Sequence, residues 1–131
     1  MMSDQGTQKK VRVLVVDDEP DICDILQRFI SERGYEVRTA FGGLEAVELF
    51  KQFSPHFVLL DIMMPEVNGI DALQRIRELD KTAIVLMATA LHDLNVAKDA
   101  INIGASDYIT KPIDLQYLSD YLEEHSKKFN V

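Results

Sequence analysis

The stretch HFVLLDIMMPEVNG, residues 56–69, contains an apolar run that ends on a carboxylate. Residues 57–60 (FVLL) read as a short strand buried on both faces, which is typical of a parallel sheet. Asp61 follows directly, and PEVNG after it has the composition of a turn. An aspartate at the edge of a core is costly to desolvate unless another group pairs with it. The rest of the sequence must therefore indicate which group offsets the charge of Asp61.

Outward from this stretch, strand-like and helix-like segments alternate. The expected strands are residues 11–16, 35–39, 57–60, 83–88 and 106–110. The expected helices carry apolar residues at helical spacing and cover residues 22–30, 44–53, 70–79, 93–103 and 115–122. Ile25 is expected on the core side of the first helix, Cys23 just off it, and Asp114 as the N-cap of the last. Five strand–helix repeats predict one α/β sandwich, a parallel sheet with helices on both faces.

Size and charge narrow the class of protein. A chain of 131 residues fits one domain, and we expect residues 1–10 to be a flexible lead-in and residues 11–128 to be the domain. The formal net charge of −8 argues against direct binding to nucleic acid or to an anionic membrane. The single cysteine cannot form an internal disulfide, and no apolar run is long enough to span a bilayer. We expect a soluble, cytoplasmic protein.

Polar side chains follow four of the five expected strands. In open parallel sheets, ligands bind beyond the carboxyl ends of the strands. The residues at those ends are Asp17, Asp18, Glu19, Asp61, Thr89, Thr110 and Lys111. Carboxylates that crowd together must take up protons or a cation, and oxygen ligands without histidine or cysteine favour Mg²⁺ or Mn²⁺ over Zn²⁺. A lysine and a hydroxyl facing such a site suit a phosphoryl group, with Asp61 as a nucleophile that forms an acyl phosphate.

Four motifs, in order, resemble the receiver domain of two-component response regulators. They are VLVVDDEPD (13–21), VLLDIMMPEVNGID (58–71), LMATA (86–90) and GASDYITKPID (104–114). The resemblance covers residues 11 to about 127. It implies a flavodoxin-like (βα)5 fold, a three-layer sandwich around a parallel five-stranded sheet of order 2-1-3-4-5. It also implies a stand-alone signalling domain, or the isolated receiver of a longer regulator, and not an enzyme.

The resemblance assigns roles to individual residues. Asp61 would accept a phosphoryl group from a phosphohistidine on a histidine kinase or a phosphotransfer protein. Asp17 and Asp18 would bind Mg²⁺, directly or through water, together with Asp61 and the backbone carbonyl of Met63. Lys111 and the Thr89 hydroxyl would hold phosphoryl oxygens. Thr89 and Tyr108 would be switch residues, and the Lys111–Pro112 peptide would be cis.

The same resemblance places the output on one surface. Phosphorylation would alter the face formed by the helix at 93–103, the strand at 106–110 and the last helix, and a downstream protein would bind there. Tyr117 and Tyr121 lie one turn apart on that last helix, as part of a docking surface or as rim packing. The pattern of basic and acidic residues that is typical of the dimer face in winged-helix regulators is not obvious in this last helix. We therefore expect a monomer or a weak dimer. His56, His92 and His125 read as ordinary surface or turn residues.

Other functions remain open. A flavin-binding electron carrier would need a phosphate loop where this chain has DDEPD. A Mg²⁺-dependent phosphatase with an aspartate nucleophile would typically have a second aspartate where Met63 stands. A degenerate receiver would act as an interaction module without phosphorylation. Met63 and Leu91 occupy family positions that flank the attacking water in hydrolysis, and since both are apolar we predict slow self-dephosphorylation.

Overall fold

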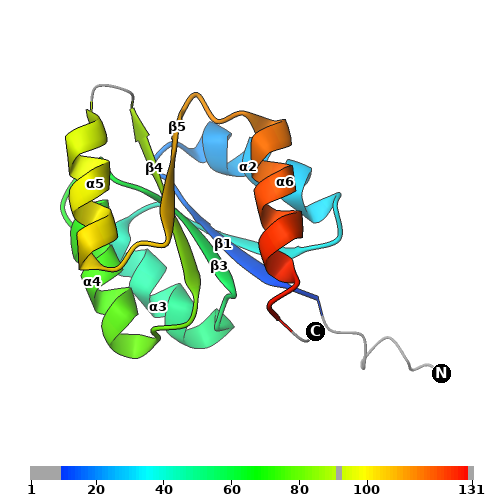
Figure 1. Ribbon diagram of the computed structural model, residues 1–131, viewed down its shortest axis with the longest axis horizontal. Helices are drawn as coiled ribbons and strands as arrows, with labels where there is room; N and C mark the ends of the chain where they lie inside the picture. The colour runs from blue at the N-terminus through cyan, green and yellow to red at the C-terminus, as the bar shows by residue number, and fades with distance from the viewer. Residues whose placement is uncertain (1–9, 91–92, 130–131) are drawn as a thin grey trace.

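The computed structural model describes residues 10–90 and 93–129 and forms a three-layer α/β sandwich (Figure 1). All strand pairs are parallel, in the order β2-β1-β3-β4-β5. The strands are β1 (Arg12–Val16), β2 (Glu36–Ala40), β3 (Phe57–Asp61), β4 (Ile84–Ala90) and β5 (Asp107–Lys111). The helices are α2 (Pro20–Ser31), α3 (Gly43–Phe53), α4 (Gly69–Leu79), α5 (Leu94–Ile103) and α6 (Leu115–Ser126). The expected fold class and strand order are confirmed.

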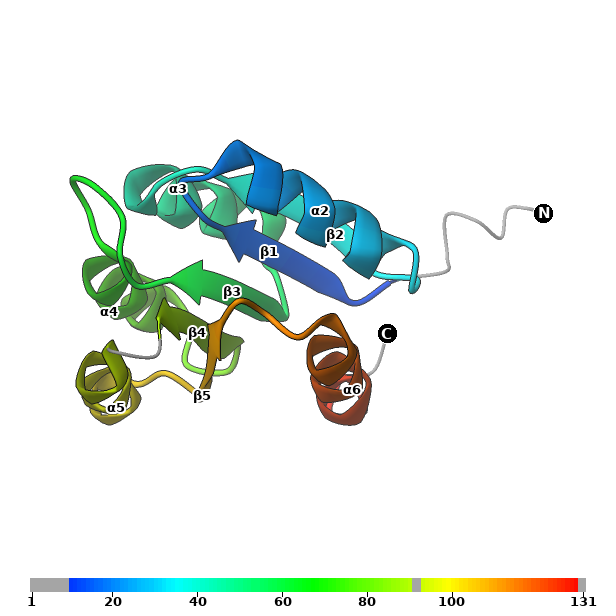
Figure 2. The ribbon, with the colours of Figure 1, turned by 90° about the horizontal axis from the view of Figure 1, so that it is seen from above.

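The helices cover the two faces of the sheet unequally, and each face has its own apolar core. One face carries α2 and α6, whose buried residues pack with alternate side chains of the strands. The other carries α3, α4 and α5 over the remaining strand side chains (Figure 2). Strand β3 is buried along its whole length, as its unbroken apolar run predicts for a central parallel strand.

Strand pairing places polar residues inside the ends of the strands. Asp61 pairs with Ala88, so β3 runs one residue further than the apolar pattern predicts. Lys111 pairs with Ala90 and becomes the last residue of β5. The bond from Lys111 to Pro112 is cis, as the family resemblance implies. Asp114 caps α6 as expected, because its Oδ1 accepts the Tyr117 amide hydrogen at 3.1 Å.

The rotation of α2 differs from the prediction in two positions. Cys23 is buried, and its thiol donates to the carbonyl of Asp17 at 3.3 Å. Ile25 is 52% exposed, so it is not part of the core. The apolar spacing alone did not separate these faces, because α2 also borders a surface groove whose apolar lining continues the stripe.

His56 lies at a bend between α3 and β3, which agrees with the prediction of a surface or turn residue. His56 is half-buried, its Nδ1 accepts the Arg12 amide hydrogen at 2.9 Å, and its ring lies 4.7 Å from that of Phe129. His125 stacks on Tyr121 with a centroid distance of 4.0 Å. His92 lies outside the described residues. No helix in the described part of the chain is long and apolar enough to cross a membrane.

Candidate functional site

Four strand ends meet at one edge of the sheet and bring the predicted site residues toward one another. Strand β1 leads into Asp17 and Asp18, and β3 ends on Asp61 beside it, because β1 and β3 are hydrogen-bonded neighbours. Strand β5 delivers Lys111 from the far side of β4. The order 2-1-3-4-5 therefore assembles residues that are up to 94 positions apart in the sequence.

Lys111 lies between two buried carboxylates. Its Nζ is 3.0 Å from Asp17 Oδ2 and 3.2 Å from Asp61 Oδ2. The side chains of Asp17 and Asp61 are 4% and 6% exposed, whereas that of Lys111 is 26% exposed. Backbone amides satisfy the other carboxylate oxygens: the Glu19 N–H donates to Asp17 Oδ1 at 2.9 Å. Lys111 therefore supplies the positive charge that offsets the cost of burying Asp61.

The pKa shifts follow from this crowding. Burial raises the pKa of Asp61, and the charge of Asp17 raises it further, although Lys111 and the Met63 amide oppose both effects. Burial lowers the pKa of Lys111, but hydrogen bonds and charges from Asp17 and Asp61 more than compensate, so its pKa lies above the ordinary value. One ammonium between two carboxylates leaves the cluster with excess negative charge.

The carboxylates fit a hard divalent cation. One oxygen from each of Asp17, Asp18 and Asp61 falls within 4.8 Å of the others. The ligand atoms are all oxygens, and Asp18 is exposed, so the cluster is open on the side from which an ion and its water ligands would enter. The chemistry of this donor set matches Mg²⁺ or Mn²⁺.

Thr89 lies near this edge, whereas Tyr108 lies closer to the start of β5, where it pairs with Met87. In the described residues neither side chain forms a hydrogen bond to Asp61. Thr89 is 1% exposed, and its hydroxyl donates to the Ala90 carbonyl at 3.3 Å, with the Asp93 carbonyl at 3.5 Å. Tyr108 is half-buried and packs against the core under α5. The structure thus places the predicted metal ligands and Lys111 together, and the two predicted switch residues at the adjoining strands β4 and β5.

The segment after β3 borders Asp61. The Met63 amide donates to Asp61 Oδ1 at 3.3 Å, and the Met63 side chain is 63% exposed. Leu91, the other position predicted to flank an attacking water, lies outside the described residues. Of the two positions predicted to flank an attacking water, the structure therefore describes only Met63, which lies next to Asp61.

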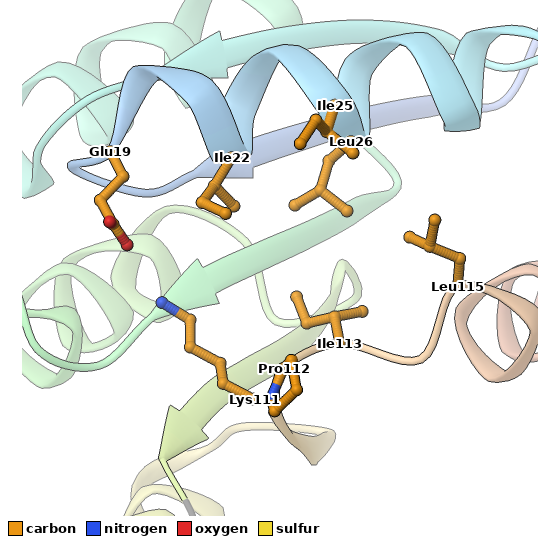
Figure 3. A pocket seen from close by; sticks show the side chains of 8 residues that line it. All are labelled: Glu19, Ile22, Ile25, Leu26, Lys111, Pro112, Ile113 and Leu115. Atoms are coloured by element: carbon orange, nitrogen blue, oxygen red, sulfur yellow. The ribbon is translucent and has the colours of Figure 1, made fainter.

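An apolar groove adjoins the acidic cluster (Figure 3). Its volume is about 210 Å³, and it lies between α2 and the segment that follows β5. Ile22 and Leu26 point from α2 toward Ile113 across it, and Glu19 and Lys111 form the end nearest the site. Ile25, which is exposed, is one of the residues that line this groove.

A second hollow, of about 420 Å³, opens beside β5 and is lined by Tyr108 and Tyr117. Tyr117 is 48% exposed, but Tyr121 is 8% exposed and belongs to the core under α6. Of the two tyrosines, Tyr117 alone suits a docking surface, and Tyr121 is core packing. On α5, Ile101 and Ile103 are 38% and 37% exposed. Helix α5 therefore has an exposed apolar component.

Comparison with known proteins agrees with this geometry. The profile of the response regulator receiver domain family matches residues 13–123. The chemotaxis protein CheY of Thermotoga maritima is 39% identical over 117 residues, which cover 88% of this chain and 98% of that protein. The transcriptional regulatory protein TrcR of Mycobacterium tuberculosis is 37% identical over 82% of this chain but only 42% of its own length. The chain spans less than half of such longer regulators.

Solved structures give the same result. A CheY-like receiver domain protein from Methanospirillum hungatei superposes with a TM-score of 0.86 at 27% identity, covering 92% of this chain and 96% of that one. CheY4 of Vibrio cholerae superposes with a TM-score of 0.83 at 25% identity, covering 88% and 98%.

The fold and the acidic strand edge define a CheY-like signalling domain of two-component systems. The chain belongs to the response regulator receiver domain family.

Proposed function

We propose that the protein is a phosphorylation-activated switch that accepts a phosphoryl group on Asp61. The observation that carries this proposal is the Lys111 ammonium, 3.0 and 3.2 Å from two buried carboxylates at the carboxyl edge of the sheet. Such a cluster is costly to keep for stability alone, since buried ion pairs gain little over apolar packing. Around a phosphoryl group, the lysine and a cation held by the carboxylates would stabilise the negative charge of the phosphoryl oxygens.

The proposed step is a single transfer. An Asp61 oxygen attacks the phosphorus of a phosphohistidine on a histidine kinase or phosphotransfer protein. The O–P bond forms as the P–N bond breaks, and the imidazole nitrogen that leaves takes a proton from solvent. Lys111 moves its contact from carboxylate to phosphoryl oxygen, and the Thr89 hydroxyl donates to another phosphoryl oxygen.

Asp17, Asp18, Asp61 and the Met63 carbonyl would hold Mg²⁺, or Mn²⁺ in its place. When bound, the ion neutralises negative charge on the phosphoryl oxygens. The fit rests on three carboxylate oxygens within 4.8 Å of one another. Asp61 has a direct contact to the lysine, so the same residue links the ion to Lys111.

The output would be a change of surface. Thr89 leaves its carbonyl partners to reach the phosphoryl group, and Tyr108 on the adjoining strand turns inward toward the space that Thr89 vacates. The surface of α5, β5 and α6 then changes, and a downstream protein binds there. Residues 11–128 would form the receiver unit, acting as a monomer or a weak dimer.

Intact mass after incubation with acetyl phosphate tests the proposal. We expect a gain of one phosphoryl group that requires Mg²⁺ and is absent in Asp61→Asn. No gain in a protein that still binds Mg²⁺ would identify a degenerate receiver, which signals through its surface alone.

A further inference from the structure

The loop between β3 and α4, residues 62–68, runs beside α3 (Figure 2), and its residue Val67 lies against the first residue of that helix. Gly43 is that residue, and a Cβ atom at this position would collide with the Val67 carbonyl oxygen and lie 2.6 Å from Val67 Cγ1. Nothing of this kind surrounds Gly42, where a Cβ would meet no atom within 4 Å. Two adjacent glycines therefore differ sharply in what they allow.

Local backbone preference does not explain Gly43. It is a helical residue without the positive φ that favours glycine, and it is buried. Alanine is the better helix former by about 1 kcal/mol. The contact with Val67 is therefore the reason that this position has no side chain.

The same loop reaches the acidic cluster at both ends. At the start of the loop, the Met63 amide donates to Asp61 Oδ1 at 3.3 Å. Just past the end, the Gly69 amide donates to the Ile62 carbonyl at 2.9 Å and closes the loop on itself. A Cβ on Gly69 would collide with the Asp61 carbonyl oxygen and lie 2.7 Å from Ile62 Cα. Because Gly69 packs directly on the backbone of Asp61 and Ile62, a displacement of Val67 that moves Gly69 would also displace that backbone.

We propose that Gly43 is a positioning residue for the metal site. Val67 packs against Gly43 in the space that a side chain would occupy, and this contact fixes the loop and with it the positions of Asp61 and the Met63 carbonyl. The inference rests on the proposed function, because it concerns the same cation site. Mg²⁺ demands near-ideal octahedral geometry, so a displacement of about 1 Å at two of its ligands weakens binding strongly.

The test compares Gly43→Ala with Gly42→Ala as its matched control, in the full chain. Mg²⁺ affinity is measured by titration calorimetry at neutral pH, and the folded fraction of each variant is checked by urea unfolding. We expect Gly43→Ala to bind Mg²⁺ about tenfold more weakly. Gly42→Ala should match the wild type. A role in folding alone would lower the urea midpoint and leave the Mg²⁺ affinity of the folded protein unchanged.

Val67→Ala provides a second variant that introduces no collision. It removes the methyl groups above Gly43, and we expect a smaller loss of Mg²⁺ affinity, about two- to threefold, because the loop is held less firmly.

Asp61→Asn separates this inference from the proposed function. If wild type binds Mg²⁺ through Asp61 while Gly43→Ala and Val67→Ala bind it equally well, the positioning role is wrong and the proposed function stands. If wild type binds no Mg²⁺, both are wrong.

Discussion

Replacement of Lys111 by methionine removes the cation that two buried carboxylates share. Lys111 touches Asp17 at 3.0 Å and Asp61 at 3.2 Å, and the methionine that replaces it keeps the length of the side chain without its charge. In the absence of a metal ion, the two carboxylates then face each other in a site where both are almost fully buried. We expect the variant to be markedly less stable at neutral pH.

The magnitude follows from the distances. At an effective dielectric constant of 20, each contact of Lys111 is worth about 5 kcal/mol before dehydration is subtracted. Removal of one partner from a buried ion pair costs about 3–5 kcal/mol in other proteins. Since the Lys111 side chain is 26% exposed, solvent screens these contacts and we expect a cost at or just below the lower limit of that range, about 2–3 kcal/mol.

The pH dependence has a definite sign. In the wild type the pKa of Lys111 is raised, so its contribution is fully present at neutral pH and is lost only as the pH rises through that raised value. In the variant, Asp61 keeps the burial and the Asp17 charge that raise its pKa and loses the lysine that opposes them. Its proton uptake therefore relieves the repulsion as the pH falls, and the difference in stability from wild type shrinks toward pH 4.

Urea unfolding followed by far-ultraviolet circular dichroism, with EDTA present, measures these differences, because the chain has no tryptophan for fluorescence. Lys51→Met is the matched control, since Lys51 forms an exposed pair with Glu48 and should contribute almost nothing. Asp61→Asn in the Lys111→Met background should restore most of the lost stability. A cost below about 0.5 kcal/mol, or an equal cost at pH 7.5 and pH 4, would refute the electrostatic reasoning.

Three further outcomes are expected. Wild-type stability should fall as the pH drops below about 6.5, because burial and then Arg12 lower the pKa of His56, and urea midpoints of His56→Gln should lack this slope. Met63→Asn should shorten the lifetime of the phosphorylated protein about tenfold, the effect of one hydrogen bond to the attacking water, and an unchanged decay of phosphoprotein would contradict this. Arg77→Met should cost about 2–3 kcal/mol in urea unfolding, because Arg77 donates to the carbonyls of Gly104 and Ala83 at 2.7 and 2.6 Å.

The sequence predicted the fold because its apolar runs have the two periods that the elements impose. Strand β3 reads as a buried strand since every residue from Phe57 to Leu60 is apolar, and it is buried on both faces. The site was predictable for a related reason. Parallel strands present their carboxyl ends at one edge, so residues at or just after the strand ends, such as Asp17, Asp61 and Lys111, had to meet there.

What the sequence did not predict depends on contacts between distant elements. The shared position of Lys111 between two carboxylates could not be read from strand order alone, and neither could the seat of Val67 on Gly43. The signal for the second was present as two glycines at the start of a helix, Gly42 as the N-cap and Gly43 as the first helical residue, where one glycine would suffice as an N-cap. The exposure of Ile25 was missed because a groove and a core have the same apolar composition.

The location of the phosphoryl group is the most direct test of the proposed switch. After incubation with acetyl phosphate and Mg²⁺, borohydride reduces an acyl phosphate to an alcohol, which converts the modified aspartate to homoserine at a position that peptide sequencing by mass spectrometry can identify. We predict homoserine at residue 61 alone, and none when Mg²⁺ is withheld. Homoserine at residue 17 or 18, or at no position in a protein that binds Mg²⁺, would contradict the assignment of Asp61 as the phosphoacceptor.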